Sequence, residues 1–360
     1  MVAVLWALLP ALVRHGPRPT PSHRAQPVVA RVGAGGKPLN ILVVEAYDKV
    51  GINNLYAVGC RKASETFVDM LLTLSPAKYS CSVTVIEPCS DGFSMPTVDT
   101  IGQYDGVVWT GSSLTIHDDA PDVKRQIELA RLCFAAAVPQ YGSCWGLQLS
   151  AAAAGLPCEE NPKGREHGIG RDITLTSEGL VHPMFDGTQR TFDGLVAHTD
   201  QVASSWALAD PPRCPPGVSA CVLARNEWSP VQALSVRMGG GVFWAVQYHP
   251  ELEVRDVARL MLTPATRKRL VDQGSFASDE ELVRYSKDLE QAQLDPNDTE
   301  LRRRLRLDDD ILDPARRSRE LANWLQHLVV PTMARDLNHM RGPRSSPVSP
   351  KLVGECFIAD

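Results

Sequence analysis

The sequence predicts an α/β fold, a three-layer sandwich in which helices cover both faces of a mostly parallel central sheet. From Asn40 onward, short apolar runs of strand length alternate with segments of helical periodicity, which is the pattern of successive βα units. The 360 residues are 44% hydrophobic and 22% charged, so the chain can bury a large apolar core.

Strands and helices are expected to alternate along this core. In its first half the predicted strands lie at 41–45, 81–86, 106–110 and 138–141, and the predicted helices at 63–74, 122–136 and 145–154. In its second half the strand-like runs lie at 173–176, 221–225, 231–237 and 242–248. Gly239-Gly240-Gly241 separates the last two runs and predicts a hairpin turn.

The composition changes at both ends of this predicted domain, which spans residues 39–262. Residues 263–340 are rich in charge with interspersed Leu, Trp and Val, and predict a helical extension whose charges face solvent. Residues 341–360 carry three prolines and predict a disordered tail. Residues 1–38 contain arginines but no acidic residue, which predicts a disordered leader or, alternatively, a transit peptide for an organelle.

Charge, hydropathy and cysteine usage exclude several classes of protein. The net charge of -5 provides no global basic surface, so nucleic acid is not an expected partner. No apolar run reaches the roughly 18 residues that span a bilayer, so a membrane is not expected either. The nine cysteines are odd in number and form no Cys-x-x-Cys pair, which predicts neither a disulfide framework nor a zinc site and favours a reducing, cytoplasmic location. We expect no metal and no cofactor.

One cysteine stands in a pattern that predicts a nucleophile. Gly142-Ser143-Cys144-Trp145-Gly146 lies between a predicted strand and a predicted helix, as in a nucleophile elbow with sulfur in place of a serine oxygen. The two glycines leave room for the cramped turn. The helix N-terminus favours the thiolate, and the backbone N–H of Trp145 is placed to hold an oxyanion. A buried structural cysteine between two turn glycines is the alternative.

A base and a carboxylate follow near the end of the predicted core. His249-Pro250-Glu251 ends a strongly apolar strand, because Pro250 cannot donate to a sheet ladder. In an extended chain, the side chains of residues i and i+2 point to the same side, so Glu251 can orient the His249 imidazole. The histidine would take the thiol proton and later give it to the leaving amine. Cys144, His249 and Glu251 are therefore the predicted catalytic triad.

The cysteine elbow followed by the His-Pro-Glu segment resembles the class I glutamine amidotransferase family. Within this family, the resemblance is to stand-alone proteins similar to the glutaminase domain of GMP synthase. The resemblance covers about residues 40–262 and implies a flavodoxin-like α/β sandwich. It implies a second oxyanion donor from Gly111 or Ser112, in the segment 105–112. It also implies a substrate-contacting group at four positions: Gln148, Glu166, His198 and Asp200.

The resemblance implies that Cys144 attacks the side-chain carboxamide of glutamine and that water then hydrolyses a glutamyl thioester. The sequence contains neither a Ser-Gly-Gly-x-Asp-Ser loop nor a P-loop, so an ammonia acceptor would be bound by a synthetase partner chain. A γ-glutamyl peptide hydrolase would use the same triad on a γ-glutamyl amide, and remains open. A non-catalytic interaction subunit that works through its helical extension is the third reading.

Overall fold

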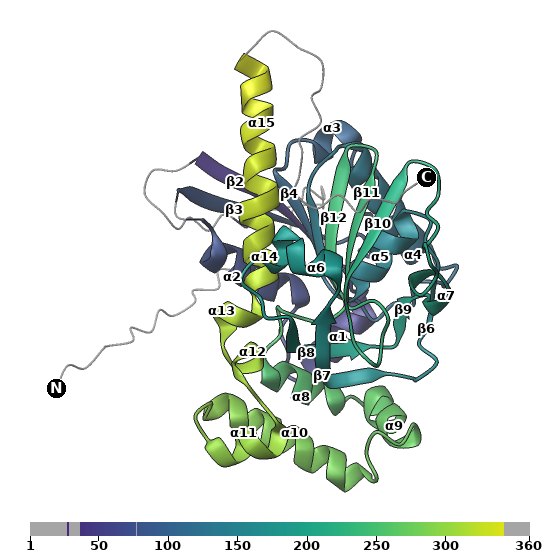
Figure 1. Cartoon of the computed structure of the whole chain (residues 1–360), viewed down its shortest axis with the longest axis vertical. Coiled ribbons are helices and arrows are strands. Elements are labelled where there is room, and N and C mark those ends of the chain that lie inside the picture. Colours follow the sequence, from purple (N-terminus) through teal and green to yellow (C-terminus); the bar gives the residue numbers. More distant parts are fainter. Residues whose placement is uncertain (1–26, 29–36, 77, 342–360) are drawn as a thin grey trace, which may run out of the picture.

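A single mixed sheet forms the centre of the molecule (Figure 1). The computed structural model describes residues 27–28, 37–76 and 78–341. The order of the ten strands across the sheet is β1-β3-β2-β4-β5-β12-β11-β10-β7-β8. Their bounds are β1 Pro27–Val28, β2 Lys37–Val44, β3 Tyr79–Ile86, β4 Gly106–Trp109, β5 Gln140–Ser143, β7 Glu166–Leu175, β8 Thr191–His198, β10 Val218–Arg225, β11 Ala233–Met238 and β12 Gly241–Val246. Two short strands, β6 (Cys158–Glu160) and β9 (Asp200–Val202), pair separately.

The sheet is parallel in one half and antiparallel in the other. Strands β3, β2, β4, β5 and β12 run parallel, which agrees with the predicted βα units. From β12 through β11, β10 and β7 to β8, every neighbour is antiparallel, as is β1 beside β3. The α/β class is confirmed, but the sheet as a whole is mixed, because hairpins and meanders replace the crossover helices after β7.

Helices cover both faces of the parallel half. On one face, side chains of α2 and the C-terminal helices join alternate residues of β2, including Leu39 and Ile41. On the other face, α4 and α5 pack against Leu42 and Val44 of the same strand. The helices before the C-terminal region are α1 Lys49–Ala57, α2 Ala63–Leu74, α3 Val98–Ile101, α4 Pro121–Ala135, α5 Trp145–Ala153, α6 Ser177–Val181, the short 3-10 turn η1 Pro183–Phe185 and α7 Ser204–Ala207.

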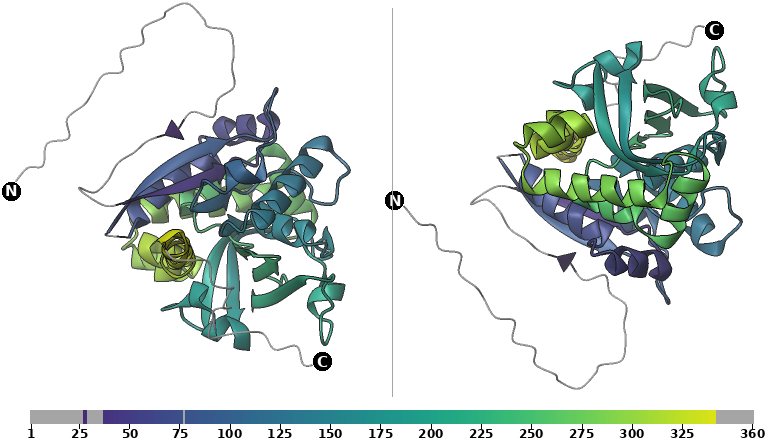
Figure 2. Two further views of the ribbon diagram at one scale, coloured as in Figure 1. Left: turned by 90° about the horizontal axis from the view of Figure 1, so that it is seen from above. Right: turned by 90° about the horizontal axis from the view of Figure 1, so that it is seen from below.

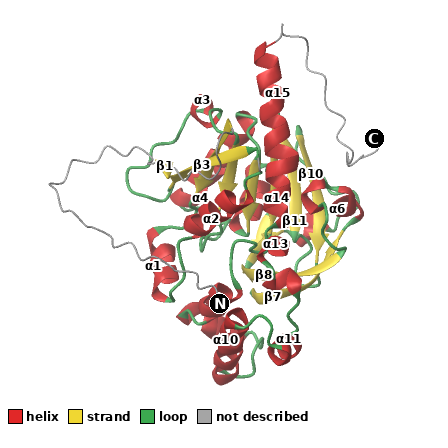
Figure 3. Cartoon of the chain, turned by 90° about the vertical axis from the view of Figure 1, so that its left-hand side faces the viewer, coloured by secondary structure: helices red, strands yellow, loops and turns green. Residues whose placement is uncertain are grey.

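The C-terminal region is helical, as predicted. After α8 (Val254–Met261) the helices are α9 Pro264–Asp272, α10 Asp279–Leu294, α11 Thr299–Leu305, α12 Asp309–Leu312, α13 Pro314–Arg317, α14 Arg319–Trp324, the π-helical segment η2 Leu325–Val329 and α15 Val330–Arg341. Figure 3 shows α10 and α11 gathered at one end of the sheet, where they form a separate apolar cluster with α8.

The last helices belong to the main core and are not a solvated appendage. Figure 2 looks along α15 and shows it lying beside the sheet. Leu321, Trp324 and Leu325 are fully buried in the apolar cluster that also holds Val43 of β2. The Trp324 ring lies 6.0 Å from that of Tyr141 in β5. The division at residue 262 stays a prediction, but packing joins the two sides of that boundary.

Most predicted elements occur within a few residues of their expected bounds. The helix at 63–74 coincides with α2, and Met238 pairs with Gly241 across the predicted glycine turn. The strands β8 and β9 were not predicted. The predicted leader and tail lie mostly outside the described residues; Pro27–Val28, the first two residues of β2 and Arg341 at the end of α15 are the parts that the structure describes. None of the described helices has the length and apolar character needed to cross a bilayer.

Candidate active site

The sheet register brings the predicted nucleophile and base to one edge. Ser143, the last residue of β5, pairs with Val246, the last residue of β12. The N–H of Cys144 then donates to the Val246 carbonyl at 2.8 Å. Trp109, at the end of β4, pairs with Gly142 on the other side of β5. The loops after three neighbouring parallel strands therefore meet at the same carboxyl edge, where α/β proteins place their sites.

Cys144 occupies a strained turn between β5 and α5. Its backbone has φ 50° and ψ -99°, a conformation that L-residues rarely adopt. A Cβ on Gly142 would lie 2.8 Å from the backbone of Gly146, and one on Gly146 would lie 3.3 Å from Cβ of Trp109. The close approach of these backbones explains both glycines of the elbow. The side chain of Cys144 is 4% exposed at the start of the helix.

The predicted base is oriented by its predicted carboxylate. His249 Nδ1 lies 2.7 Å from Glu251 Oε1, and both side chains are buried. The hydroxyl of Ser143 donates to the same carboxylate oxygen at 3.0 Å. Among the described residues, His249 Nε2 has no hydrogen-bond partner. With Nδ1 engaged by Glu251, Nε2 is the ring nitrogen available to a substrate or to the thiol.

Charge around His249 favours the imidazolium. Burial alone would lower the pKa of His249, but the Glu251 carboxylate and the Cys144 sulfur outweigh burial and raise this pKa to about 10. Burial raises the pKa of Cys60, Cys81, Cys89 and Cys158 to about 12, so these groups stay protonated at neutral pH.

The predicted oxyanion loop faces the nucleophile. A methyl group on Gly111 would lie 3.0 Å from Cε1 of His249 and 3.8 Å from Cβ of Cys144, so those two atoms are at most 6.8 Å apart. The loop is tied to Ala46, whose N–H donates to the Thr110 hydroxyl and whose carbonyl accepts from the Ser112 hydroxyl, both at 2.9 Å. Trp145 is the first residue of α5, so its N–H has no acceptor within the helix.

The four predicted substrate-contacting residues form a buried hydrogen-bond network. Glu166 accepts from His198 at 2.7 Å and is directly opposite it between β7 and β8. Gln148 donates to the main-chain oxygen of Asp200 at 2.9 Å, and the Asp200 carboxylate accepts from the N–H of Ile116 at 3.2 Å. Since these polar atoms bond to one another or to main chain, contact with substrate stays a prediction for all four.

Three residues near the triad were missed by sequence reasoning. Ser143 supports Glu251, although it was noted only as an elbow residue. Tyr47 and Arg165 also lie near Cys144: burial and the Cys144 sulfur raise the pKa of Tyr47, so its phenol stays neutral, and the Arg165 guanidinium is within electrostatic range of the same sulfur. Tyr47 follows the first predicted strand and Arg165 directly precedes Glu166, one of the predicted substrate-contacting residues, but neither has a spacing pattern with Cys144. Only the fold brings them together.

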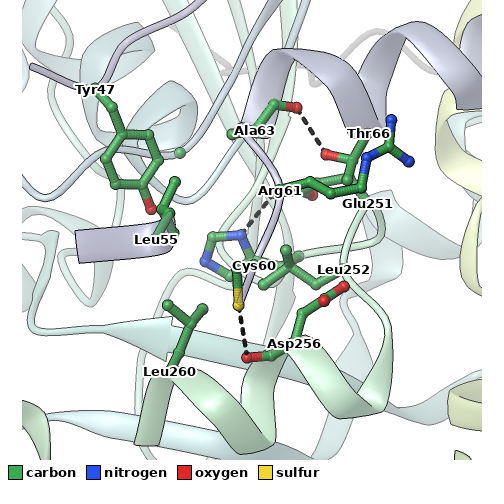
Figure 4. A pocket seen from close by; sticks show the side chains of 12 residues that line it. Tyr47, Leu55, Cys60, Arg61, Ala63, Thr66, Glu251, Leu252, Asp256 and Leu260 are labelled. Carbon is green, nitrogen blue, oxygen red and sulfur yellow. Dashed lines mark hydrogen bonds and ion pairs between the residues drawn. The ribbon is translucent and has the colours of Figure 1, made fainter. Parts of the chain in front are cut away.

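A small cavity opens beside the triad. It has a volume of about 20 Å³, room for about one water molecule. Figure 4 shows Tyr47, Cys60 and Leu252 around it, with the Cys60 sulfur 3.6 Å from the main-chain oxygen of Asp256. Gly111, His249 and Glu251 also line it. No group of three or more His, Cys, Asp or Glu side chains in the described ranges is arranged to hold a metal ion.

The family model for class I glutamine amidotransferases matches residues 74–263, which include the elbow and the His249–Glu251 segment. The chain belongs to this family. The amidotransferase chain is 34% identical over 259 residues to a γ-glutamyl-L-1-hydroxyisopropylamide hydrolase from a Pseudomonas species, a match that covers 65% of this chain and 76% of the relative. The family and this relative identify a cysteine-nucleophile amide hydrolase, as predicted.

One solved structure has the same fold. The crystal structure of SMU.1228c superposes with a TM-score of 0.52 at 16% identity, covering 80% of this chain and 99% of the other. A glutamine amidotransferase from Methylobacillus flagellatus has a TM-score of 0.47 at 20% identity, covering 81% of this chain and 95% of the other.

Proposed function

We propose that this amidotransferase hydrolyses a γ-glutamyl amide through a thioester at Cys144, with His249 and Glu251 completing the triad. The observation that carries the proposal is the convergence of the strained Cys144 elbow with a buried His249 that is held at 2.7 Å by Glu251. The site therefore combines a nucleophile, a base and a carboxylate that orients the base, which are the three groups that nucleophilic catalysis of this kind uses. The substrate of first choice is glutamine, the simplest γ-glutamyl amide.

The reaction follows from the roles of these groups. The Cys144 thiolate attacks the carboxamide carbon and forms a C–S bond, while the N–H groups of Trp145 and the Gly111–Ser112 loop stabilise the oxyanion. The C–N bond then breaks, and the His249 imidazolium gives its proton to the departing amine. Water, deprotonated by the neutral imidazole, attacks the thioester and releases glutamate. Gln148, Glu166, His198 and Asp200 would shape the pocket wall.

A second candidate substrate is a γ-glutamyl amide of a larger amine. It is favoured by the printed name of the Pseudomonas relative, a γ-glutamyl-L-1-hydroxyisopropylamide hydrolase. The triad chemistry is identical, and only the leaving amine differs. With glutamine as substrate, the released ammonia could serve a synthetase partner chain. With an alkylamide, no partner is needed.

The test compares wild type with Cys144→Ser on L-glutamine and on γ-glutamylisopropylamide, measuring glutamate, ammonia and isopropylamine. We expect the serine variant to lose at least about 1000-fold in kcat, because a hydroxyl ionises far less readily than a thiol. A glutamine-like chloroketone should alkylate Cys144 first, because the triad places this thiol beside a base, whereas burial keeps Cys60, Cys81, Cys89 and Cys158 protonated. Wild-type rates in Cys144→Ser would rule out the assignment, and the product ratio identifies the preferred amide.

A further inference from the structure

Arg165 has a half-buried side chain whose charge has no carboxylate partner. It precedes β7, and no acidic group of the described residues lies within salt-bridge distance of its guanidinium. Its donors instead meet three neutral acceptors: His167 Nδ1 at 3.2 Å, the Thr199 hydroxyl at 3.2 Å and the Ala197 carbonyl at 3.4 Å. A guanidinium carries five N–H donors, so its capacity exceeds these contacts.

The neighbouring carboxylates are committed elsewhere. The two oxygens of Glu166 accept from His198 and from the side-chain amides of Asn226 and Gln232. Arg171, six residues on, shows the usual arrangement, since its guanidinium pairs with Asp193. Burial without such a partner lowers the pKa of Arg165 and is costly, so the charge is placed at the expense of stability.

The guanidinium is held in a defined position. His167 Nε2 lies 3.2 Å from the Val257 carbonyl, so this nitrogen donates and Nδ1 accepts from Arg165. Burial and the adjacent guanidinium lower the pKa of His167 well below its usual value, which keeps the ring neutral in this role. The Gln273 side chain binds both the N–H and the carbonyl of Arg165. Such a preorganised cation suits recognition of an anion.

Arg165 lies close enough to Cys144 for a glutamyl group to reach both residues. The Ala197 carbonyl oxygen lies 3.4 Å from Nη2 of Arg165 and 3.9 Å from Sγ of Cys144, so these two atoms are at most 7.3 Å apart. In a γ-glutamyl group, four bonds separate the carbonyl carbon under attack from the α-carboxylate carbon, a span of about 5 Å. A substrate with its carbonyl at Cys144 can therefore reach the guanidinium with its carboxylate.

We propose that Arg165 binds the α-carboxylate of the substrate's γ-glutamyl group and so determines that the amide is glutamyl. The inference rests on the proposed γ-glutamyl amide hydrolysis and specifies its substrate class. The planar guanidinium pairs with a carboxylate through two parallel N–H donors, which fixes both the distance and the orientation of the chain that leads to Cys144. Amides without this carboxylate are poor substrates.

The kinetic test pairs substrates with and without the carboxylate: L-glutamine with 4-aminobutanamide, and γ-glutamylisopropylamide with 4-amino-N-isopropylbutanamide. We expect Arg165→Gln to lower kcat/KM for each glutamyl amide about 100-fold, mainly through KM, and to leave the carboxyl-free amides within about 3-fold. Arg165→Lys keeps the positive charge but loses the two parallel N–H donors, so its kcat/KM for the glutamyl amides should lie between those of wild type and Arg165→Gln. Equal losses on both members of a pair, or no loss on either, would overturn the inference.

A charge-matched control and a binding measurement separate this inference from the proposed function. Arg269 lies near Arg165 but pairs with Glu160 on the surface, so Arg269→Gln should leave the selectivity unchanged. In a Cys144→Ala background, calorimetry should show Kd for γ-glutamylisopropylamide rising at least about 10-fold with Arg165→Gln. If wild type hydrolyses none of the four amides, the proposed function fails and this binding result alone decides on Arg165. An unchanged Kd would then reject it.

Discussion

At the scale of single residues, Glu251 determines the protonation of the base. Its carboxylate lies 2.7 Å from Nδ1 of His249 and outweighs burial in raising the His249 pKa to about 10. The sign follows directly: a raised pKa keeps the imidazolium until the pH approaches that value. The His249 imidazolium, which is the general acid for the leaving amine, is therefore lost only at alkaline pH.

Glu251→Gln should move this alkaline limit. The amide keeps a hydrogen bond to His249 but removes the negative charge, so the His249 pKa falls by about 1–3 units. We expect the alkaline limb of kcat/KM to shift to lower pH by a similar amount, with a smaller loss at neutral pH than in His249→Ala. A pH–rate profile of both variants measures this. An alkaline limb that stays in place would show that Glu251 does not support the imidazolium.

At the scale of elements, α14 contacts the segment between β12 and the base. Glu320 on this helix is buried and accepts from the Tyr248 hydroxyl at 2.7 Å, one residue before His249. Burial raises the Glu320 pKa from 4.5 to about 7. The unfolded chain then releases this proton near pH 4.5, while the folded protein keeps it until about pH 7. Stability from this group is therefore present below pH 4.5 and is lost as the pH rises to 7.

Glu320→Gln should remove this dependence. Relative to wild type, the variant should gain up to about 3 kcal/mol in free energy of unfolding between pH 4.5 and pH 7, and no more above that. Urea denaturation across this pH range gives the difference. Glu300→Gln, which removes an exposed carboxylate from α11, controls for net charge. A constant difference between Glu320→Gln and wild type would mean that Glu320 is ionised throughout.

At the scale of the whole molecule, the C-terminal helices complete the core. Six buried apolar residues beyond Ser318 pack in the main cluster: Leu321, Trp324, Leu325, Leu328, Val329 and Met333. Each buried side chain of this size contributes about 1.5–3 kcal/mol, so the six together contribute about as much as the net 5–15 kcal/mol by which a typical domain is stable. The amidotransferase domain therefore depends on them.

A variant that ends at Ser318 should not fold cooperatively. Its exposed apolar face should bind a hydrophobic dye, and its thermal transition should be lost or broad. A variant that ends at Arg341 keeps every described residue and is the matched control. If the shorter chain melts like the longer one and keeps its hydrolytic activity, α14 and the segments after it are dispensable, and the predicted boundary at residue 262 is the better description.

Local sequence determined much of the fold and the candidate triad. Glycines at 142 and 146 mark the elbow because a Cβ there would lie 2.8 Å from the Gly146 backbone and 3.3 Å from Cβ of Trp109, respectively, which leaves little or no room. His249 and Glu251 are two residues apart, so their pairing follows from extended geometry. Short-range periodicity likewise located α2 and most parallel strands. These features depend on neighbours within a few residues, which a sequence displays directly.

Tertiary structure decided the rest, because it depends on contacts between distant segments. The antiparallel half of the sheet follows from the pairing of β7 with β8 and β10, which joins segments up to about 50 residues apart in the chain, so local sequence does not fix the direction of pairing. Trp324 lies in the main core although its surroundings in the sequence are charged, since a helix needs only one apolar face to pack. Whether Arg165 has a carboxylate partner depends on what every surrounding element contributes. Only the folded structure shows this, because no spacing of neighbouring residues in the sequence predicts it.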